Sequence, residues 1–153
     1  MEEEEREGWA AGPRLRASRS RAKYEPWVQT PMAEIEVVHT SEMKKSDFTS
    51  GIIRDKAFET PGLLFARSRI KGGNISGWHH HGKRETFAFV LHGQLHFEWV
   101  DGEKGSADVK AGDFFRIPIG LIHRDVNPNP NEEAVIINLF LGEGPTTVNV
   151  PPP

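Results

Sequence analysis

The histidines are the residues of this chain whose type and spacing most clearly suggest chemistry. Six of the seven lie between His79 and His123, and His79, His80 and His81 are consecutive. Successive side chains of a strand alternate between its two faces, so His79 and His81 share one face and His80 takes the other. Glu85 has the same parity as His79 and His81 if the chain stays extended. Two imidazoles and one carboxylate on one face are donors typical of a transition-metal site.

The residues that follow Glu85 suggest which face is interior. Bulky side chains share the parity of Glu85, and smaller or more polar ones have the opposite parity. The first set is Phe87, Phe89 and Leu91, and the second is Thr86, Ala88, Val90 and His92. Bulky apolar residues favour the interior, so Glu85 is predicted to face inward. Imidazole suits zinc, copper, iron and nickel, and a carboxylate admits manganese and iron. The expected cofactor is therefore a divalent transition metal (Fe, Mn, Zn, Ni or Cu).

A second group of residues has a fixed spacing. Five residues separate Gly112 from Pro118, one separates Pro118 from Gly120, two separate Gly120 from His123, and three separate His123 from Asn127. This pattern resembles the second motif of the cupin superfamily at every fixed position. The resemblance implies a double-stranded β-helix, that is, a jelly-roll barrel, and it makes His123 a metal ligand. Asn127 is expected to hydrogen-bond to backbone in the loop that follows.

The upstream segment resembles the first cupin motif, with one departure. The resemblance carries metal ligation to His79, His81 and Glu85. Seven residues lie between Glu85 and the closing Gly93, one more than the family usually has. A β-bulge could absorb the extra residue and keep Glu85 inward, which the facing argument favours. Otherwise Thr86 faces inward and three histidines alone bind the metal, as in the thiol dioxygenases of the same superfamily.

Basic residues close to these ligands are candidates for holding a substrate. They are Lys83, Arg84, Arg116 and Arg124. A guanidinium can pair with a carboxylate through two hydrogen bonds, and we regard Arg116 as the best candidate for substrate binding. Glu85 is the candidate catalytic residue, because in an isomerase or lyase it could act as a general base.

The strand-like segments fit an all-β fold. Short apolar or alternating runs separated by turn residues occur at 35–38, 63–70, 86–91, 94–100, 108–110, 114–117, 123–126 and 134–141. Many short strands of this kind predict a sandwich or barrel. The cupin barrel is expected over residues 32–146, with an extended C-terminal tail over 147–153. Residues 1–31 carry an acidic and a basic cluster and few apolar residues, which predicts a disordered charged tail.

Composition narrows the classes of function. The chain has no cysteine, which excludes disulfides, thiolate zinc sites and cysteine nucleophiles. The formal net charge is −3, so no basic excess favours nucleic-acid binding. The sequence contains no apolar run long enough to cross a membrane and no recognisable signal peptide. We therefore expect a cytoplasmic protein without nucleic-acid or membrane partners.

Three hypotheses for the function remain. The leading one is a metal-dependent enzyme of dioxygenase type that acts on a small organic molecule, with isomerase or lyase chemistry as its variant. The second is a non-catalytic cupin module that holds a small ligand or a metal. The third is an interaction protein that works through the basic residues of segment 14–23. The cupin resemblance also implies a homodimer, with residues 34–58 supplying the exchanged or added strands.

Overall fold

Alternating and apolar segments separated by turns form strands in the computed structural model, which describes residues 34–153. The predicted charged tail of residues 1–31 lies outside this range. The elements in chain order are the 3-10 helix η1 (Thr40–Glu42) and the strands β1 (Lys44–Lys45), β2 (Ile52–Thr60), β3 (Leu63–Ile70), β4 (His79–His80), β5 (Glu85–His92), β6 (Gln94–Asp101), β7 (Glu103–Lys110), β8 (Phe114–Ile117), β9 (Ile122–Val126), β10 (Ala134–Leu141) and β11 (Val148–Asn149).

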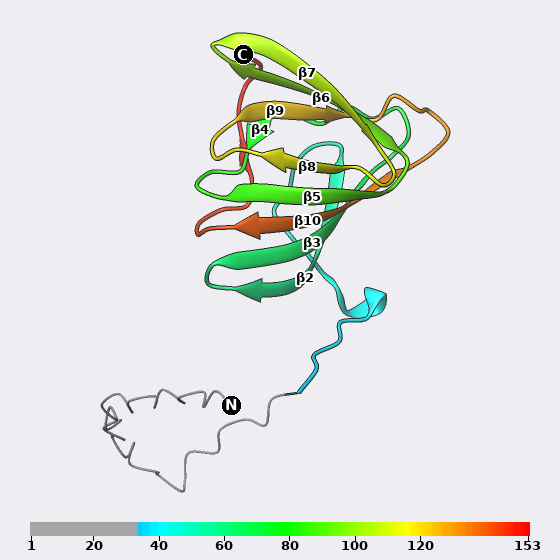
Figure 1. The fold of residues 1–153 in the computed structure, drawn as a ribbon, viewed down its shortest axis with the longest axis vertical. Helices are drawn as coiled ribbons and strands as arrows, with labels where there is room; N and C mark the ends of the chain where they lie inside the picture. The colour runs from blue at the N-terminus through cyan, green and yellow to red at the C-terminus, as the bar shows by residue number, and fades with distance from the viewer. Residues whose placement is uncertain (1–33) are drawn as a thin grey trace, which may run out of the picture. The chain divides into compact units, whose positions relative to one another are not determined.

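The strands form two antiparallel sheets whose strand orders are β1-β2-β3-β10-β5-β8 and β11-β4-β9-β6-β7. Figure 1 shows β2, β3, β10 and β5 lying side by side in the first sheet. From β3 onward the chain crosses repeatedly between the sheets, because β3, β5, β8 and β10 belong to the first and β4, β6, β7, β9 and β11 to the second. This winding is the predicted jelly-roll barrel, so the all-β fold class is confirmed.

The apolar core closes one end of the barrel. Ile52 begins β2, Ile70 ends β3 and Ala134 begins β10, and the register places these three residues side by side. All three are buried, and Leu95 near the start of β6 packs in the same cluster. The opposite end of β3 and β10 carries a second, smaller apolar cluster of Leu64, Ala66 and Phe140. The histidines lie toward that end, with the ring centroids of His81 and Phe140 5.1 Å apart.

Several strands differ from the predicted segments. Residues 35–38 form no strand within the described chain, while β2 has no counterpart among the predictions and β7 begins earlier than the predicted 108–110. Both unpredicted stretches are rich in charged residues, so their apolar pattern is weak. The C-terminal segment 147–153, expected to be an extended tail, contains β11, which pairs with β4. Within residues 34–153 no helix is long and apolar enough to span a membrane.

The N-terminal strands pair inside the chain. In β1 and β2, Lys44 faces Lys56 and Lys45 faces Asp55, and β2 runs beside β3 along its whole length. This segment was expected to serve a second copy by exchange or addition. The homodimer itself stays a prediction.

Asn127 anchors the loop between β9 and β10 to the barrel by hydrogen bonds. Its side-chain amide donates to the carbonyl oxygens of Ile70, at 3.0 Å, and Glu132, at 2.8 Å. Its Oδ1 accepts the amide hydrogen of Asn129, with an N–O distance of 3.0 Å. The residue is 1% exposed, and the bond to Ile70 is buried while the other two are partly buried. The structure thus confirms the predicted backbone role of this motif residue.

We predict that Asn127→Ala lowers the free energy of unfolding by roughly 2–4 kcal/mol, because it leaves backbone groups of the interior without hydrogen-bond partners. Chemical denaturation monitored by circular dichroism measures the change. Asn131→Ala, at an exposed position of the same loop, is the matched control and is expected to change stability by less than about 0.5 kcal/mol. Equal stability of the two variants would contradict the structural role of Asn127.

Candidate metal centre

Pairing of β4 with β9 brings together three histidines that are far apart in sequence. His79 on β4 lies opposite His123 on β9 in the ladder. His81 follows β4 directly, and Gly82 then turns the chain with a φ of 59°, in the left-handed region that favours glycine. His79, His81 and His123 are 0%, 3% and 2% exposed, whereas His80 takes the other face.

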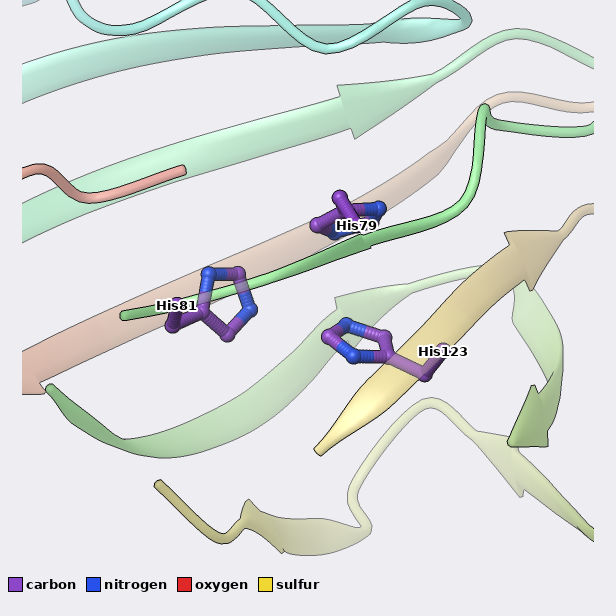
Figure 2. Close-up of side chains that lie close together, drawn as sticks. All are labelled: His79, His81 and His123. Carbon is purple, nitrogen blue, oxygen red and sulfur yellow. The ribbon is translucent and has the colours of Figure 1, made fainter. Parts of the chain in front are cut away.

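The three imidazole rings face a common space (Figure 2). Their centroids lie 5.3 Å apart for His79 and His81, 4.3 Å for His79 and His123, and 5.0 Å for His81 and His123. One nitrogen from each ring lies within 4.8 Å of its counterparts in the other two. Three imidazole nitrogens gathered in this way can bind one transition-metal ion.

Backbone carbonyls orient all three rings. The Nδ1 atom of His79 lies 2.9 Å from the carbonyl oxygen of Gly77. The Nδ1 atom of His81 lies 2.8 Å from the carbonyl oxygen of Thr146. The Nδ1 atom of His123 lies 2.9 Å from the carbonyl oxygen of Leu121. A carbonyl can only accept, so each neutral ring donates from Nδ1 and keeps a lone pair on Nε2. Histidines that bind metals are usually held by a hydrogen bond of this kind.

The Nε2 atoms of this group are free to bind a metal ion. Among the described residues, the buried Nε2 atoms of His79 and His123 have no hydrogen-bond partner. A buried polar atom without a partner costs about 1–3 kcal/mol, which a bound cation would recover. The donor set and the orphaned nitrogens therefore fit a transition-metal ion.

Burial keeps the imidazoles of His79 and His81 neutral. Removal from water lowers the pKa of His79 from 6.5 to about 4, with the nearby Asp125 carboxylate partly opposing the shift. Burial also lowers the pKa of His81 well below 6.5, and the neighbouring His123 and Arg54 add to this effect. Neutral imidazole is the form that binds metal, so His79 and His81 need lose no proton near pH 7.

Glu85, predicted as a metal ligand and catalytic residue, lies outside this group. Its carboxylate pairs with Arg116 of β8 on the outer side of the sheet. The facing prediction was wrong because the outer surface of this sheet is itself apolar. Phe87 and Leu91, which share the parity of Glu85, are partly exposed there, as is Phe114 of β8. Bulk therefore did not identify the interior face.

Thr86 occupies the inward position instead, which was the alternative reading of the first motif. It is fully buried, like the next residues of its parity, Ala88 and Val90. A register irregularity does occur in β5, where the partners of Val135 and Ile136 are His92 and Val90. It lies at the far end of the strand from Glu85. The extra residue is absorbed there, and Thr86 still faces inward.

Arg116, predicted to bind substrate, is among the residues that line a cavity, but its side chain is 58% exposed. The cavity has a volume of about 320 Å³ and is also lined by His123. The Arg116 guanidinium is already paired with Glu85. Arg84 is buried, and its Nε donates to the carbonyl oxygen of Gly144 at 2.8 Å.

Two charged residues of the interior were missed by the sequence reasoning. Asp125 lies two residues after His123 on β9, and Arg54 lies on β2; both are buried. Parity with His123 could have identified Asp125, since alternate residues of a strand share a face. Arg54 belongs to a strand that was not predicted, so no signal pointed to it.

Comparison with known proteins identifies the family. Residues 66–140 match the model of the cupin domain. Germin-like protein 8-9 from Oryza sativa subsp. japonica is 33% identical over 103 residues, which are 65% of this chain and 46% of that protein. This chain thus spans slightly under half the length of that relative. The barrel is a cupin domain, and the chain is a member of the cupin superfamily.

Solved structures show the same fold. A chain from a study of the mechanism of oxalate oxidase has a TM-score of 0.64 and 21% identity, covering 84% of this chain and 74% of that one. A chain from a study of the Mn(II) centres of Bacillus subtilis oxalate decarboxylase has a TM-score of 0.60 and 22% identity, covering 72% and 31%.

We predict that the metal-free protein loses stability as the pH falls from 6.5 toward 4. In this window the unfolded chain binds a proton at His79 that the folded chain does not, so acidification favours unfolding. Full protonation of this one group corresponds to roughly 3 kcal/mol. Denaturant titrations at several pH values measure the slope.

His79→Gln should make that slope shallower, with His81 still contributing to it, and His92→Gln, at an exposed position, should leave it unchanged. A stability that stays level between pH 6.5 and 4.5 would contradict a buried neutral His79.

Proposed function

We propose that this protein is a metal-dependent enzyme of dioxygenase type that acts on a small organic molecule with an apolar body. One observation carries the proposal: three buried imidazoles converge beside an apolar cavity, with their Nδ1 atoms held by backbone carbonyls. Three protein ligands leave positions of the ion open for other molecules, which is the arrangement of a catalytic rather than a structural site.

The cavity favours apolar substrates. Most of its walls are aromatic or aliphatic, and His123 contributes the edge nearest the metal centre. The apolar lining consists of Phe97, Trp99, Ala107, Val109, Phe115, Ile117, Pro118 and Leu121. At about 320 Å³, it lies near the lower limit for small-molecule pockets. A small ring system with one metal-binding oxygen or sulfur fits this lining better than a dicarboxylate does.

Different residues would bind the metal ion and the substrate. A bound ion of suitable redox chemistry would polarise the substrate and activate oxygen. His79, His81 and His123 would hold the ion, and Phe97, Trp99 and their neighbours would orient the substrate and exclude water. The proposed metal is divalent, and manganese is the first to examine because a protein of the same fold has Mn(II) centres.

The other hypotheses receive less support. Isomerase or lyase chemistry with Glu85 as the base is disfavoured because this carboxylate pairs with Arg116 on the outer side of the sheet. An interaction through residues 14–23 concerns a segment outside the described residues. A non-catalytic cupin module uses the same metal centre, so only a turnover measurement distinguishes it from an enzyme.

We predict that the protein purified without added metal contains a transition metal and consumes oxygen with a diketone, flavonol or thiol. Elemental analysis and an oxygen electrode provide the two measurements, with oxalate included among the compounds. His79→Ala and His123→Ala should each lower metal affinity by more than about 100-fold and abolish oxygen uptake, because each removes a ligand. His92→Gln is the control and should retain both properties.

The two readouts separate the alternatives. Metal retained by His79→Ala and His123→Ala would contradict the metal centre. Metal lost by these variants, together with no oxygen uptake by the parent protein on any of the compounds, would contradict the enzyme and favour the non-catalytic module. Faster turnover of oxalate than of the apolar compounds would contradict the proposed substrate class.

A further inference from the structure

Asp125 places a buried carboxylate beside the three-histidine group. It lies two residues after His123 on β9, so both side chains point from the same face of the strand. Its Oδ1 atom lies 3.7 Å from the Nε2 atom of His123. The residue is 6% exposed, and within residues 34–153 this Oδ1 atom has no hydrogen-bond partner.

The backbone around Asp125 is held firmly. Its amide donates to the Oγ atom of Ser76 at 2.8 Å, and its carbonyl oxygen accepts the amide hydrogen of Ser76 at 2.8 Å. Ser76 lies three residues before His79, in the segment that leads into β4. The same contacts therefore position the carboxylate and the histidines relative to one another.

The interior cation Arg54 acts on this carboxylate without direct contact: burial lowers the pKa of Arg54, and Asp125 is the charge that opposes this most. Arg54 is buried, and its Nε and Nη1 atoms donate to Ser68 Oγ at 3.2 Å and Thr147 Oγ1 at 2.6 Å. The ion pairs found in the described part of the chain include none between Arg54 and Asp125. A buried carboxylate with a free oxygen is costly unless a cation stands beside it.

A metal ion would meet this requirement. Two donor atoms that each bind one ion at about 2.1 Å lie roughly 3–4 Å apart, and the 3.7 Å between Asp125 Oδ1 and His123 Nε2 falls in that range. Within the described residues only the three histidines have donor atoms that all lie within 4.8 Å of one another, so the Asp125 side chain would turn toward the ion on binding. Three neutral imidazoles leave the full double charge of a divalent ion uncompensated in the barrel. One carboxylate in contact with the ion halves it.

We propose that Asp125 is the carboxylate ligand of this metal centre, in the role that the sequence suggested for Glu85. The inference rests on the proposed metal binding at the histidines. It implies a site of three imidazoles and one carboxylate whose acidic member comes from β9 rather than β5. Such a site favours hard divalent ions such as Mn²⁺ more than three imidazoles alone would.

The test is calorimetric titration of Mn²⁺ into the full-length chain after chelation. Asp125→Asn, which keeps the shape and removes the charge, and Asp125→Ala should each raise the Kd by about tenfold or more. Asp108→Asn is the matched control, because Asp108 is an exposed carboxylate bonded to a histidine, His96, at 2.8 Å. Asp108→Asn and Glu85→Gln should leave the Kd unchanged.

A second readout guards against variants that fold poorly. The Mn²⁺ electron paramagnetic resonance spectrum of Asp125→Asn should change its zero-field splitting, and that of Glu85→Gln should match the parent. An unchanged Kd and spectrum in Asp125→Asn, with binding abolished in His123→Ala, would overturn this inference and leave the proposed function standing. Retained binding in His123→Ala would instead overturn the proposed function.

Discussion

The hydrogen bonds from three imidazole Nδ1 atoms to backbone carbonyls are the interactions on which the site depends. They use the only proton of each neutral ring and direct the Nε2 lone pairs into the barrel. Two of these bonds are local, since Gly77 and Leu121 each lie two residues before the histidine they hold. The third runs from His81 to the carbonyl oxygen of Thr146, in the segment that leads to β11, so the C-terminal end of the chain helps to orient His81.

The barrel can hold imidazoles with unpaired nitrogens because one end supplies stability and the other end supplies the binding site. One end is closed by a cluster of buried apolar residues, including Ile52, Ile70, Leu95 and Ala134. The other end carries a smaller apolar cluster and the imidazoles of His79 and His123, whose Nε2 atoms are buried without partners among the described residues, at a cost of about 1–3 kcal/mol each. Apolar burial at the first end offsets the local cost at the second, where binding requires unsatisfied groups.

The fold and three of the site residues could be predicted because they depend on fixed spacings. The second motif identified His123, and the alternation of a strand placed His79 and His81 on one face. The runs at 63–70, 114–117 and 134–141 match β3, β8 and β10 at both ends. Segments whose positions are exposed and charged, such as most of β7, lack such a pattern and were not predicted in full.

Side-chain size could not predict which face of β5 points into the barrel. Both faces of this strand are apolar, and the position of Glu85 depends on its pairing with Arg116 across the outer surface. Asp125 was missed because motif spacing does not mark it, although its parity with His123 does. In the site proposed above, the acidic ligand comes from β9 rather than β5, while the histidine pattern stays recognisable.

X-ray absorption spectroscopy of the metal-loaded, full-length chain tests the metal centre most directly. The structure predicts the multiple-scattering signature of three imidazole rings, with nitrogen donors at about 2.0–2.2 Å from the ion. A spectrum fitted by oxygen donors alone, or by fewer than two imidazoles, would contradict a metal centre built from His79, His81 and His123.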